Sequence, residues 1–143
     1  MAKEERGKHY IKNYELESQT SYSNYPDWLL RSFRFKALIG RDAPIPDTDV
    51  GASAFELDPG AYYPGHAHPW PEIYIITSGT AECKWGDETF IAQPGTITHC
   101  PPNTSHAMRV TSREPLRAVI VSWAPGGQSE VWDAESRIIE EAG

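Results

Sequence analysis

Four side chains that commonly bind metals stand close together in the middle of the sequence. His66 and His68 are separated by one residue, Glu72 follows four residues after His68, and His106 comes later. Residues two apart on a strand point to the same face, so the first two imidazoles would lie side by side. Three neutral imidazoles and one carboxylate suit a divalent transition metal and leave room for water or substrate. The spacing therefore predicts an open, catalytic type of metal site.

The segments that carry these residues are predicted to be short strands. Pro69-Trp70-Pro71 forms a turn signal that would return Glu72 toward the histidine pair, and His106 opens a strand after Pro101-Pro102-Asn103. Runs rich in β-branched and aromatic residues alternate with such Gly and Pro turns along the chain. Many short strands at this spacing are typical of a β-sandwich or barrel. We therefore expect an all-β fold.

No linker divides the chain, so we expect a single barrel domain with short additions at both ends. The barrel is predicted over residues 32–133. Residues 1–31 read as a polar N-terminal arm followed by a short helical turn, with Asp27 as its cap after Pro26. Residues 134–143 read as an acidic C-terminal tail at the solvated surface, which either frays or forms a short helix with Asp133 as its cap.

Composition and charge exclude several classes of protein. The chain has 143 residues, with 20 acidic and 13 basic side chains and a formal net charge of -7, which argues against nucleic-acid binding. No apolar run is long enough to predict a membrane span, and the first residues lack the apolar core of a secretory signal. Cys83 and Cys100 are too few for a disulfide scaffold. We expect a cytoplasmic protein with two reduced thiols.

Two blocks of the sequence resemble the motifs of the cupin superfamily. The first motif, G-x5-H-x-H-x3-E-x6-G, is matched throughout, and the second, G-x5-P-x-G-x2-H-x3-N, is matched at three positions; the matching residues are Gly60, His66, His68, Glu72 and Gly79, then Gly95, Pro101 and His106. Asn103 stands where the family prefers Gly, and Asn tolerates the same left-handed turn. Val110 stands where the family prefers Asn. Neither departure touches a ligand position.

The resemblance implies a small antiparallel double-stranded β-barrel, or jelly roll, that holds one metal ion. It assigns His66, His68, Glu72 and His106 as the metal ligands. The same ligands accept Fe, Mn, Ni, Co or Zn, so the sequence does not select the metal. The resemblance also implies a homodimer.

A narrower resemblance concerns the short cupin lyases that cleave dimethylsulfoniopropionate into dimethyl sulfide and acrylate. The run from His66 to Tyr74 is similar to their H-x-H-x3-E-x-Y block. In that group the tyrosine acts at the reacting centre, which implies a catalytic role for Tyr74; packing in the barrel core is the alternative. A second tyrosine of that group has no match near the C-terminus, where this chain has Glu130-Val131-Trp132.

Strand parity predicts what surrounds the site. If Glu72 points inward, so does Tyr74, while Ile73 and Ile75 point outward and form an apolar patch that a second subunit would cover. Aromatic and soft side chains near the ligands are candidates for binding a small-molecule substrate, including a sulfonium cation by cation–π contact: Tyr62, Tyr63, Trp70, Met108 and Trp123. Tyr63 would turn inward only if Pro64-Gly65 bends its strand. Parity alone does not decide whether Trp123 or Ser122 faces the pocket.

The sequence thus predicts a metal-dependent cupin enzyme that acts on a small carboxylate or carbonyl compound, with a lyase as the sharpest form. A dioxygenase or a sugar isomerase on the same ligands is a second possibility, and a non-catalytic small-molecule-binding cupin is a third. Oxygen dependence would mark the dioxygenase, and tight binding without turnover would mark the binding protein. We expect His99, which is not at a ligand position, to lie outside the site.

Overall fold

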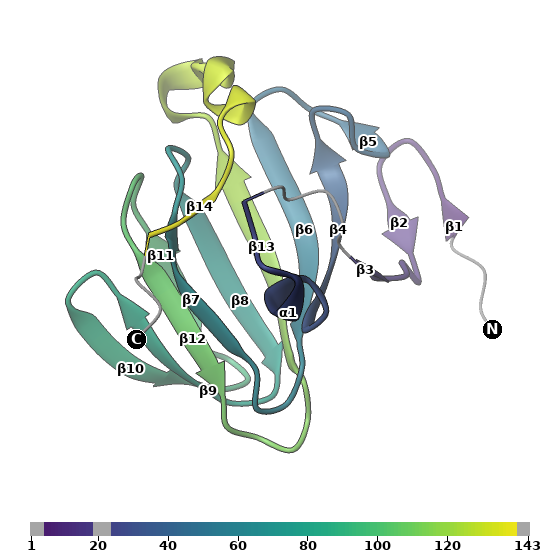
Figure 1. Ribbon diagram of the computed structural model, residues 1–143. Helices are drawn as coiled ribbons and strands as arrows, with labels where there is room; N and C mark the ends of the chain where they lie inside the picture. The colour runs from purple at the N-terminus through teal and green to yellow at the C-terminus, as the bar shows by residue number, and fades with distance from the viewer. Residues whose placement is uncertain (1–4, 19–23, 140–143) are drawn as a thin grey trace.

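A computed structural model describes residues 5–18 and 24–139, and strands dominate it (Figure 1). The first elements are β1 (Glu5–Arg6), β2 (Ile11–Lys12), β3 (Glu17–Ser18), α1 (Asp27–Leu30), β4 (Phe33–Gly40), β5 (Ile45–Pro46) and β6 (Val50–Leu57). They are followed by β7 (Tyr62–Ala67), β8 (Glu72–Ser78), β9 (Ala81–Trp85), β10 (Glu88–Ala92), β11 (Ile97–Cys100), β12 (His106–Val110) and β13 (Leu116–Trp123). Two 3-10 helices, η1 (Pro125–Gly127) and η2 (Ser129–Asp133), precede β14 (Arg137–Ile138).

Apart from the separate pair β1 and β2, the described strands form two sheets that face each other, as Figure 1 shows. The larger sheet has the strand order β11-β8-β13-β6-β4-β3, with β5 beside β4, and the smaller has the order β10-β9-β12-β7-β14. All pairs in both sheets are antiparallel except β4 with β5. This arrangement confirms the predicted all-β jelly-roll fold.

Side-chain alternation along the strands follows the predicted parity. On β8, Glu72, Tyr74 and Ile76 are buried, whereas Ile75 is 38% exposed. On β13 the buried residues include Ala118 and Ile120, so Ser122 shares the inward face and Trp123 does not. Trp123 instead stacks on His99, with ring centroids 6.1 Å apart. The structure thus resolves the parity of this strand in favour of Ser122.

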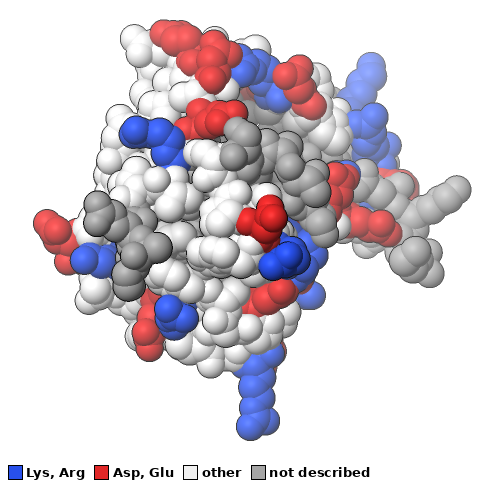
Figure 2. Space-filling model, in the orientation of Figure 1, with Lys and Arg blue, Asp and Glu red and all other residues white. Residues whose placement is uncertain are grey.

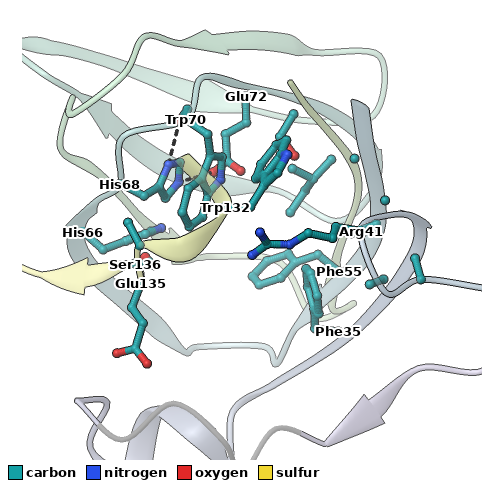
Figure 3. Close-up of a pocket in the computed structure, with 18 of the residues that line it drawn as sticks. Phe35, Arg41, Phe55, His66, His68, Trp70, Glu72, Trp132, Glu135 and Ser136 are labelled. Carbon is teal, nitrogen blue, oxygen red and sulfur yellow. Dashed lines mark hydrogen bonds and ion pairs between the residues drawn. The ribbon is translucent and has the colours of Figure 1, made fainter. Parts of the chain in front are cut away.

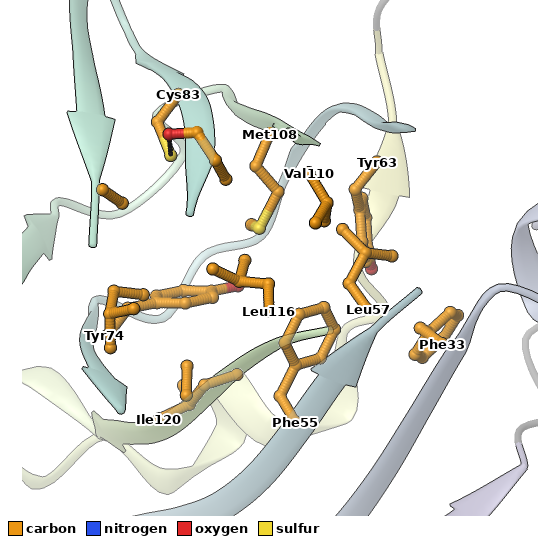
Figure 4. Close-up of a cluster of buried hydrophobic side chains, with 14 of the residues drawn as sticks. Phe33, Phe55, Leu57, Tyr63, Tyr74, Cys83, Met108, Val110, Leu116 and Ile120 are labelled. Carbon is orange, nitrogen blue, oxygen red and sulfur yellow. Dashed lines mark hydrogen bonds between the residues drawn. The ribbon is translucent and has the colours of Figure 1, made fainter. Parts of the chain in front are cut away.

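The same inward faces carry different residues at the two ends of the barrel. At one end, which we call the histidine end, Glu72 pairs across the sheet with Ser122, and His106 begins β12. At the other, which we call the leucine end, Leu57 pairs with Leu116. Figure 4 shows the cluster of buried hydrophobic side chains between the sheets, which includes Leu57 and Leu116. Its most completely enclosed aliphatic members are Leu29, Leu57, Met108, Val110 and Leu116. The fully enclosed aliphatic side chains therefore gather at the leucine end, whereas the buried polar ligands lie at the histidine end beside aromatic members of the same cluster, such as Tyr74 and Trp85.

Two turns show why the motif positions carry the residues they do. Gly79 follows β8 with φ of 80°, and a Cβ there would lie 2.4 Å from the carbonyl oxygen of Pro115. Only glycine fits both constraints. Asn103 has φ of 58°, so it adopts the left-handed conformation expected of the residue that replaces the family glycine.

Parts of the predicted N-terminal arm form paired strands. β1 and β2 form a hairpin, and β3 adds to the edge of the larger sheet beside β4. Residues 1–4 and 19–23, which also belong to the predicted arm, lie outside the described residues. The expected helical turn is present as α1, but Pro26 occupies the cap position and no side chain caps the helix. The prediction of Asp27 as the cap was therefore wrong; Asp27 is the first helical residue.

The C-terminal segment also departs from the expected solvated tail. Residues 129–133 form η2, a 3-10 helix with no side-chain cap, and Asp133 ends it rather than capping a following helix. Arg137 and Ile138 then pair with β7 at the edge of the smaller sheet, and Ser136 is buried. A two-residue strand leaves no periodic pattern in the sequence, and its partner is distant along the chain. Residues 140–143 lie outside the described residues.

Charged side chains of both signs are interspersed on the face of the molecule drawn in Figure 2. Within residues 5–18 and 24–139, the structure contains no helix with the length and apolar character needed to traverse a bilayer.

Candidate metal centre and its cavity

Three of the four predicted ligands meet at the histidine end. One carboxylate oxygen of Glu72, Oε1, lies 2.9 Å from Nε2 of His68 and 3.1 Å from Nε2 of His106. Ligand atoms of these three residues all lie within 4.8 Å of one another. Their strands explain the convergence, because His68 follows β7, while Glu72 begins β8 and His106 begins β12. All three side chains are buried.

The other ring nitrogen of each histidine is anchored to the backbone. Nδ1 of His68 bonds to the carbonyl oxygen of Trp70 at 2.7 Å, and Nδ1 of His106 bonds to that of Thr104 at 3.0 Å. A carbonyl oxygen can only accept, so Nδ1 carries the hydrogen in both rings. In a neutral imidazole this leaves Nε2 with a lone pair, the tautomer and orientation in which histidine binds metals.

This arrangement needs positive charge at its centre. Two Nε2 lone pairs and a carboxylate oxygen repel one another at about 3 Å unless protons or a cation lie among them. The donor set, two imidazoles and one carboxylate in a buried position, fits a divalent transition metal.

When protons rather than a cation lie among these atoms, each Nε2 donates to the carboxylate and the pKa values of the buried groups shift. Burial alone would raise the pKa of the Glu72 carboxyl, but hydrogen bonds from His106 and His68 outweigh burial and hold that pKa well below its usual value. Burial, followed by the charge of His106, lowers the pKa of His66 well below its usual value. Glu72 is therefore ionised and His66 neutral near pH 7, which are the forms that bind metals.

His66, the fourth predicted ligand, lies beside the other three. Its ring centroid is 3.8 Å from that of His106 and 4.0 Å from that of Tyr63. Its Nδ1 lies 2.9 Å from the carbonyl oxygen of Pro64, so it is anchored in the same way as the other two histidines. His66 is adjacent to the group formed by His68, Glu72 and His106 but is not part of it.

The histidine end opens into a cavity of about 460 Å³. Figure 3 shows His66, His68 and Glu72 on one side of it and Phe35 and Phe55 on another. The wall next to the ligands is aromatic: the indole of Trp70 stacks on His68 at 4.2 Å, and the ring of Trp132 lies 5.8 Å from that of Trp70. The cavity therefore combines an apolar, aromatic lining with a few polar groups, as small-molecule sites do.

The predicted substrate-binding residues divide into two groups. Tyr63, Trp70 and Tyr74 line the cavity. Tyr62 and Met108 do not; they border a second hollow on the smaller sheet, where Tyr62 lies 4.5 Å from the guanidinium of Arg109. Met108 is fully buried in the hydrophobic core, and Trp123 lies on the outer face against His99. The structure thus brings neither Tyr62, Met108 nor Trp123 to the candidate site.

A bulge in β7 explains why Tyr63 faces the cavity while Tyr62 faces away from it. His106 pairs with His66, but Met108 pairs with Tyr63, so β7 has one more residue than β12 over this stretch. The extra residue falls at Pro64-Gly65, the bend that would turn Tyr63 inward. Strict alternation therefore fails on this strand.

Sequence reasoning missed several residues that line the cavity. Tyr25, Arg41, Trp132 and Ser136 come from segments far from the motifs. Arg41 extends into the cavity in Figure 3, and its Nη1 donates to Asp133 at 2.8 Å. No local pattern marked these positions, because only the packing of β4 and of the C-terminal segment against the barrel brings them together.

Two further groups beside the ligands are held neutral. Tyr74 is buried among the rings of Phe55, Trp85 and His106, and burial, followed by the charge of Glu72, raises its pKa well above the usual value. The Sγ atom of Cys100 lies 3.3 Å from Nδ1 of His106, and burial raises its pKa to about 12. Tyr74 is therefore a phenol and Cys100 a thiol in the environment that the chain alone provides.

Comparisons with known proteins agree with the fold and the motifs. Residues 53–122 match the Cupin domain family. Dimethylsulfoniopropionate lyase DddQ of Ruegeria pomeroyi is 33% identical over 90 residues, which make up 62% of this chain and 44% of that protein. This chain therefore spans less than half the length of that relative.

Solved structures give the same result. The crystal structure of DMSP lyase DddQ from Ruegeria pomeroyi matches with a TM-score of 0.71 and 25% identity, covering 87% of this chain and 60% of that one. A cupin-like protein from Thermotoga maritima matches with a TM-score of 0.63 and 19% identity, covering 90% of this chain and 89% of that one. The motifs, the jelly-roll sheets and these matches agree in identifying residues 53–122 as a cupin domain.

Proposed function

We propose that this protein is a metal-dependent cupin enzyme that acts on a small carboxylate by β-elimination, in the manner of a dimethylsulfoniopropionate lyase. The observation that carries the metal dependence is the convergence of His68, Glu72 and His106, with each Nδ1 anchored and each Nε2 directed at one carboxylate oxygen. The similarity to DddQ of Ruegeria pomeroyi supports the choice of lyase.

His68, Glu72 and His106 would hold the metal, with His66 as the fourth ligand. A divalent cation bound there supplies positive charge that holds a substrate carboxylate, stabilises an enolate-like transition state and favours the phenolate of a nearby tyrosine. With one carboxylate among the ligands, the site keeps net positive charge.

The reaction requires a base and a leaving group. In dimethylsulfoniopropionate, the base removes a proton from the carbon next to the carboxylate. The electrons of that C–H bond form the new C=C bond, and the C–S bond breaks with its electrons going to sulfur. The products are dimethyl sulfide and acrylate, and the base retains the proton. No oxidant or reductant takes part.

We assign the acid–base role to Tyr74. It lies on the same inward face as Glu72, two residues along β8, and it lines the cavity. The raised pKa of its phenol in the absence of added charge means that it can serve as a base only beside a cation. This dependence links the proton transfer to the occupied metal site.

The aromatic wall suits the other end of such a substrate. Tyr63 and Trp70 line the cavity near the ligands, and Trp132 extends the same wall. Aromatic faces attract sulfonium and ammonium groups by cation–π contact, which contributes about 0.5–2 kcal/mol for each well-placed pair. A zwitterion would bind with its carboxylate toward the histidines and its cation toward the tryptophans.

The test is a direct assay of the metal-loaded protein with dimethylsulfoniopropionate, with dimethyl sulfide measured in the headspace and acrylate in solution. We expect equal amounts of both products, and loss of both in Glu72→Gln. His99→Ala, which removes an imidazole on the outer face, is the matched control and should retain activity. Product formation that requires oxygen would instead indicate a dioxygenase, isomerised sugars an isomerase, and tight binding without products a binding protein.

We also propose that the protein is a homodimer. The outer face of the larger sheet carries paired isoleucines on β8 and β11, of which Ile75 is 38% and Ile97 67% exposed. Trp123 and His99 lie on the same face. Burial of such a patch against a second copy would remove apolar area from water.

We propose a cytoplasmic location on the basis of the thiols. Cys83 and Cys100 are buried and form no disulfide, as expected for a reducing compartment. Fractionation of cells that express the full-length protein tests this, and recovery in a secreted or periplasmic fraction would contradict it.

A further inference from the structure

The position of His66 depends on the rings on either side of it. Its imidazole lies between the ring of His106, 3.8 Å away, and the ring of Tyr63, 4.0 Å away. His106 is fixed by its anchored Nδ1 and by Glu72. Nδ1 of His66 is held by the carbonyl oxygen of Pro64, so Tyr63 is the packed ring that restricts how far the imidazole can turn about this anchor.

A chain of buried hydroxyl groups holds Tyr63. Its hydroxyl lies 2.8 Å from that of Tyr25, and the Tyr25 hydroxyl donates to Oγ of Ser136 at 2.8 Å. Asn24 in turn donates to the carbonyl oxygen of Ser136 at 2.9 Å. Tyr25, Tyr63 and Ser136 are all less than 10% exposed. Hydrogen bonds between buried groups are costly to break, so this chain is well suited to fixing a ring.

The same C-terminal segment also holds the backbone behind His66. On β14, Ile138 pairs with His66, and the amide of Ile139 donates to the carbonyl oxygen of Gly65 at 2.8 Å. The hydroxyl chain thus reaches β7 at Tyr63, and the backbone of the C-terminal segment reaches the same strand at Gly65 and His66. Ser136 and His66 both line the cavity, where Figure 3 labels them.

We propose that Tyr25 and Ser136 are positioning residues for the metal centre: through Tyr63, they hold His66 where it can act as the fourth ligand. The inference rests on the proposed metal site and assigns to the C-terminal segment a function that its sequence did not suggest. Neither residue touches the metal. Loss of a partner hydrogen-bonded to a ligating histidine typically reduces metal affinity about 10–100-fold, and we expect the lower end of that range here because Tyr25 and Ser136 reach His66 through the packed ring of Tyr63.

Metal affinity tests this inference without any assay of turnover. Protein stripped with a chelator is titrated with Co²⁺, and both the Kd and the visible absorption spectrum are recorded. We expect Tyr25→Phe and Ser136→Ala to raise the Kd about 10-fold and to alter the Co²⁺ spectrum, because the geometry of the site relaxes. Ser136→Thr keeps the hydroxyl and should restore both. Ser112→Ala, which removes a serine hydroxyl bond on a distant turn, should change neither.

A double-mutant cycle identifies the route of the effect. If the hydroxyl chain acts through His66, then Ser136→Ala or Tyr25→Phe should not weaken Co²⁺ binding further in a His66→Ala background. Tyr25→Phe keeps the ring that packs on Tyr63, so it remains informative even if Ser136→Ala fails to fold. Unchanged Co²⁺ binding in folded Tyr25→Phe, or the same loss with and without His66, would overturn the inference. Wild-type protein that binds no Co²⁺ would overturn the metal site as well.

Discussion

The two ends of the barrel are built from the same strands and differ in what those strands carry. β12 begins with His106 at the histidine end and reaches Val110 at the leucine end. β13 runs the other way, from Leu116 to Ser122. The leucine end has an apolar core, whereas the histidine end encloses polar groups around a cavity. The comparison indicates that the fully enclosed aliphatic side chains and the candidate ligands lie toward opposite ends, so that a group of buried, mutually repelling donors is supported by packing elsewhere.

The largest effect that distinguishes the ends is expected at Tyr74. Removal of its hydroxyl in Tyr74→Phe keeps most of the ring packing, and general acid–base groups contribute about 10²–10⁴ in rate. We therefore expect turnover of dimethylsulfoniopropionate to fall by that factor, with little change in metal content or melting temperature. Tyr10→Phe, at an exposed tyrosine, is the control. Native turnover in Tyr74→Phe would assign this residue to the core and leave the reaction without its proposed base.

At the leucine end, we expect a substitution to reduce stability and to leave metal binding unchanged. Leu116 is fully buried, and Leu→Ala substitutions at such positions typically cost about 2–5 kcal/mol of unfolding free energy. Leu116→Ala should show a loss of that size in urea denaturation, while the folded protein still binds metal with native affinity. Ile91→Ala, at a residue that is 58% exposed, should change stability by less than about 0.5 kcal/mol. A large loss of metal affinity in folded Leu116→Ala would show that the two ends are not separate.

A smaller effect, on the pH dependence of the unfolding free energy, is expected at Glu56 on the outward side of β6 near the leucine end. Glu56, next to Leu57, accepts hydrogen bonds from Arg34 at 2.8 Å and from Arg117 at 2.7 Å. Burial raises the pKa of its carboxyl, but these two partners lower it below its usual value. A lowered folded-state pKa stabilises the protein above the unfolded-state pKa of about 4.3, and this contribution is lost as the pH falls through the folded-state value.

Glu56→Gln is therefore expected to reduce stability by about 1 kcal/mol at pH 7 and by progressively less below about pH 4. Denaturation of both proteins across this range provides the measurement. A difference that stays constant down to pH 2 would mean that the charge of Glu56 contributes nothing.

The substitution expected to disturb the fold of the single chain least is one that alters only the number of subunits in the assembly. Ile97→Glu places a charge on the outer face without touching either end of the barrel. Light scattering should give twice the 16.0 kDa chain mass for the wild type at micromolar concentration and the single chain mass for the variant. A wild type that is monomeric under these conditions would contradict the proposed dimer.

The motif spacing brings the candidate ligands together because most of their geometry is local, while their role as metal ligands stays a prediction. His66, His68 and Glu72 lie within seven residues of sequence, across the connection that leads from β7 in the smaller sheet to β8 in the larger. Strand parity correctly placed Tyr74 inward and Ile75 outward. The bulge at Pro64-Gly65 exchanged the faces of Tyr62 and Tyr63, which alternation alone does not determine. Tyr25, Arg41 and Ser136 were missed for a different reason. Each comes from a segment with no periodic signal and reaches the cavity only through contacts that are distant in sequence.

Metal analysis of protein purified without chelator tests the central claim most directly. Elemental analysis by mass spectrometry should find about one divalent transition metal ion per chain in the wild type and in His99→Ala. The folded variants Glu72→Gln and His106→Ala should contain little or none, because each removes a donor from the group in which ligand atoms lie within 4.8 Å. Full metal content in both of these variants, or a wild type that cannot be loaded with any such metal, would contradict the account.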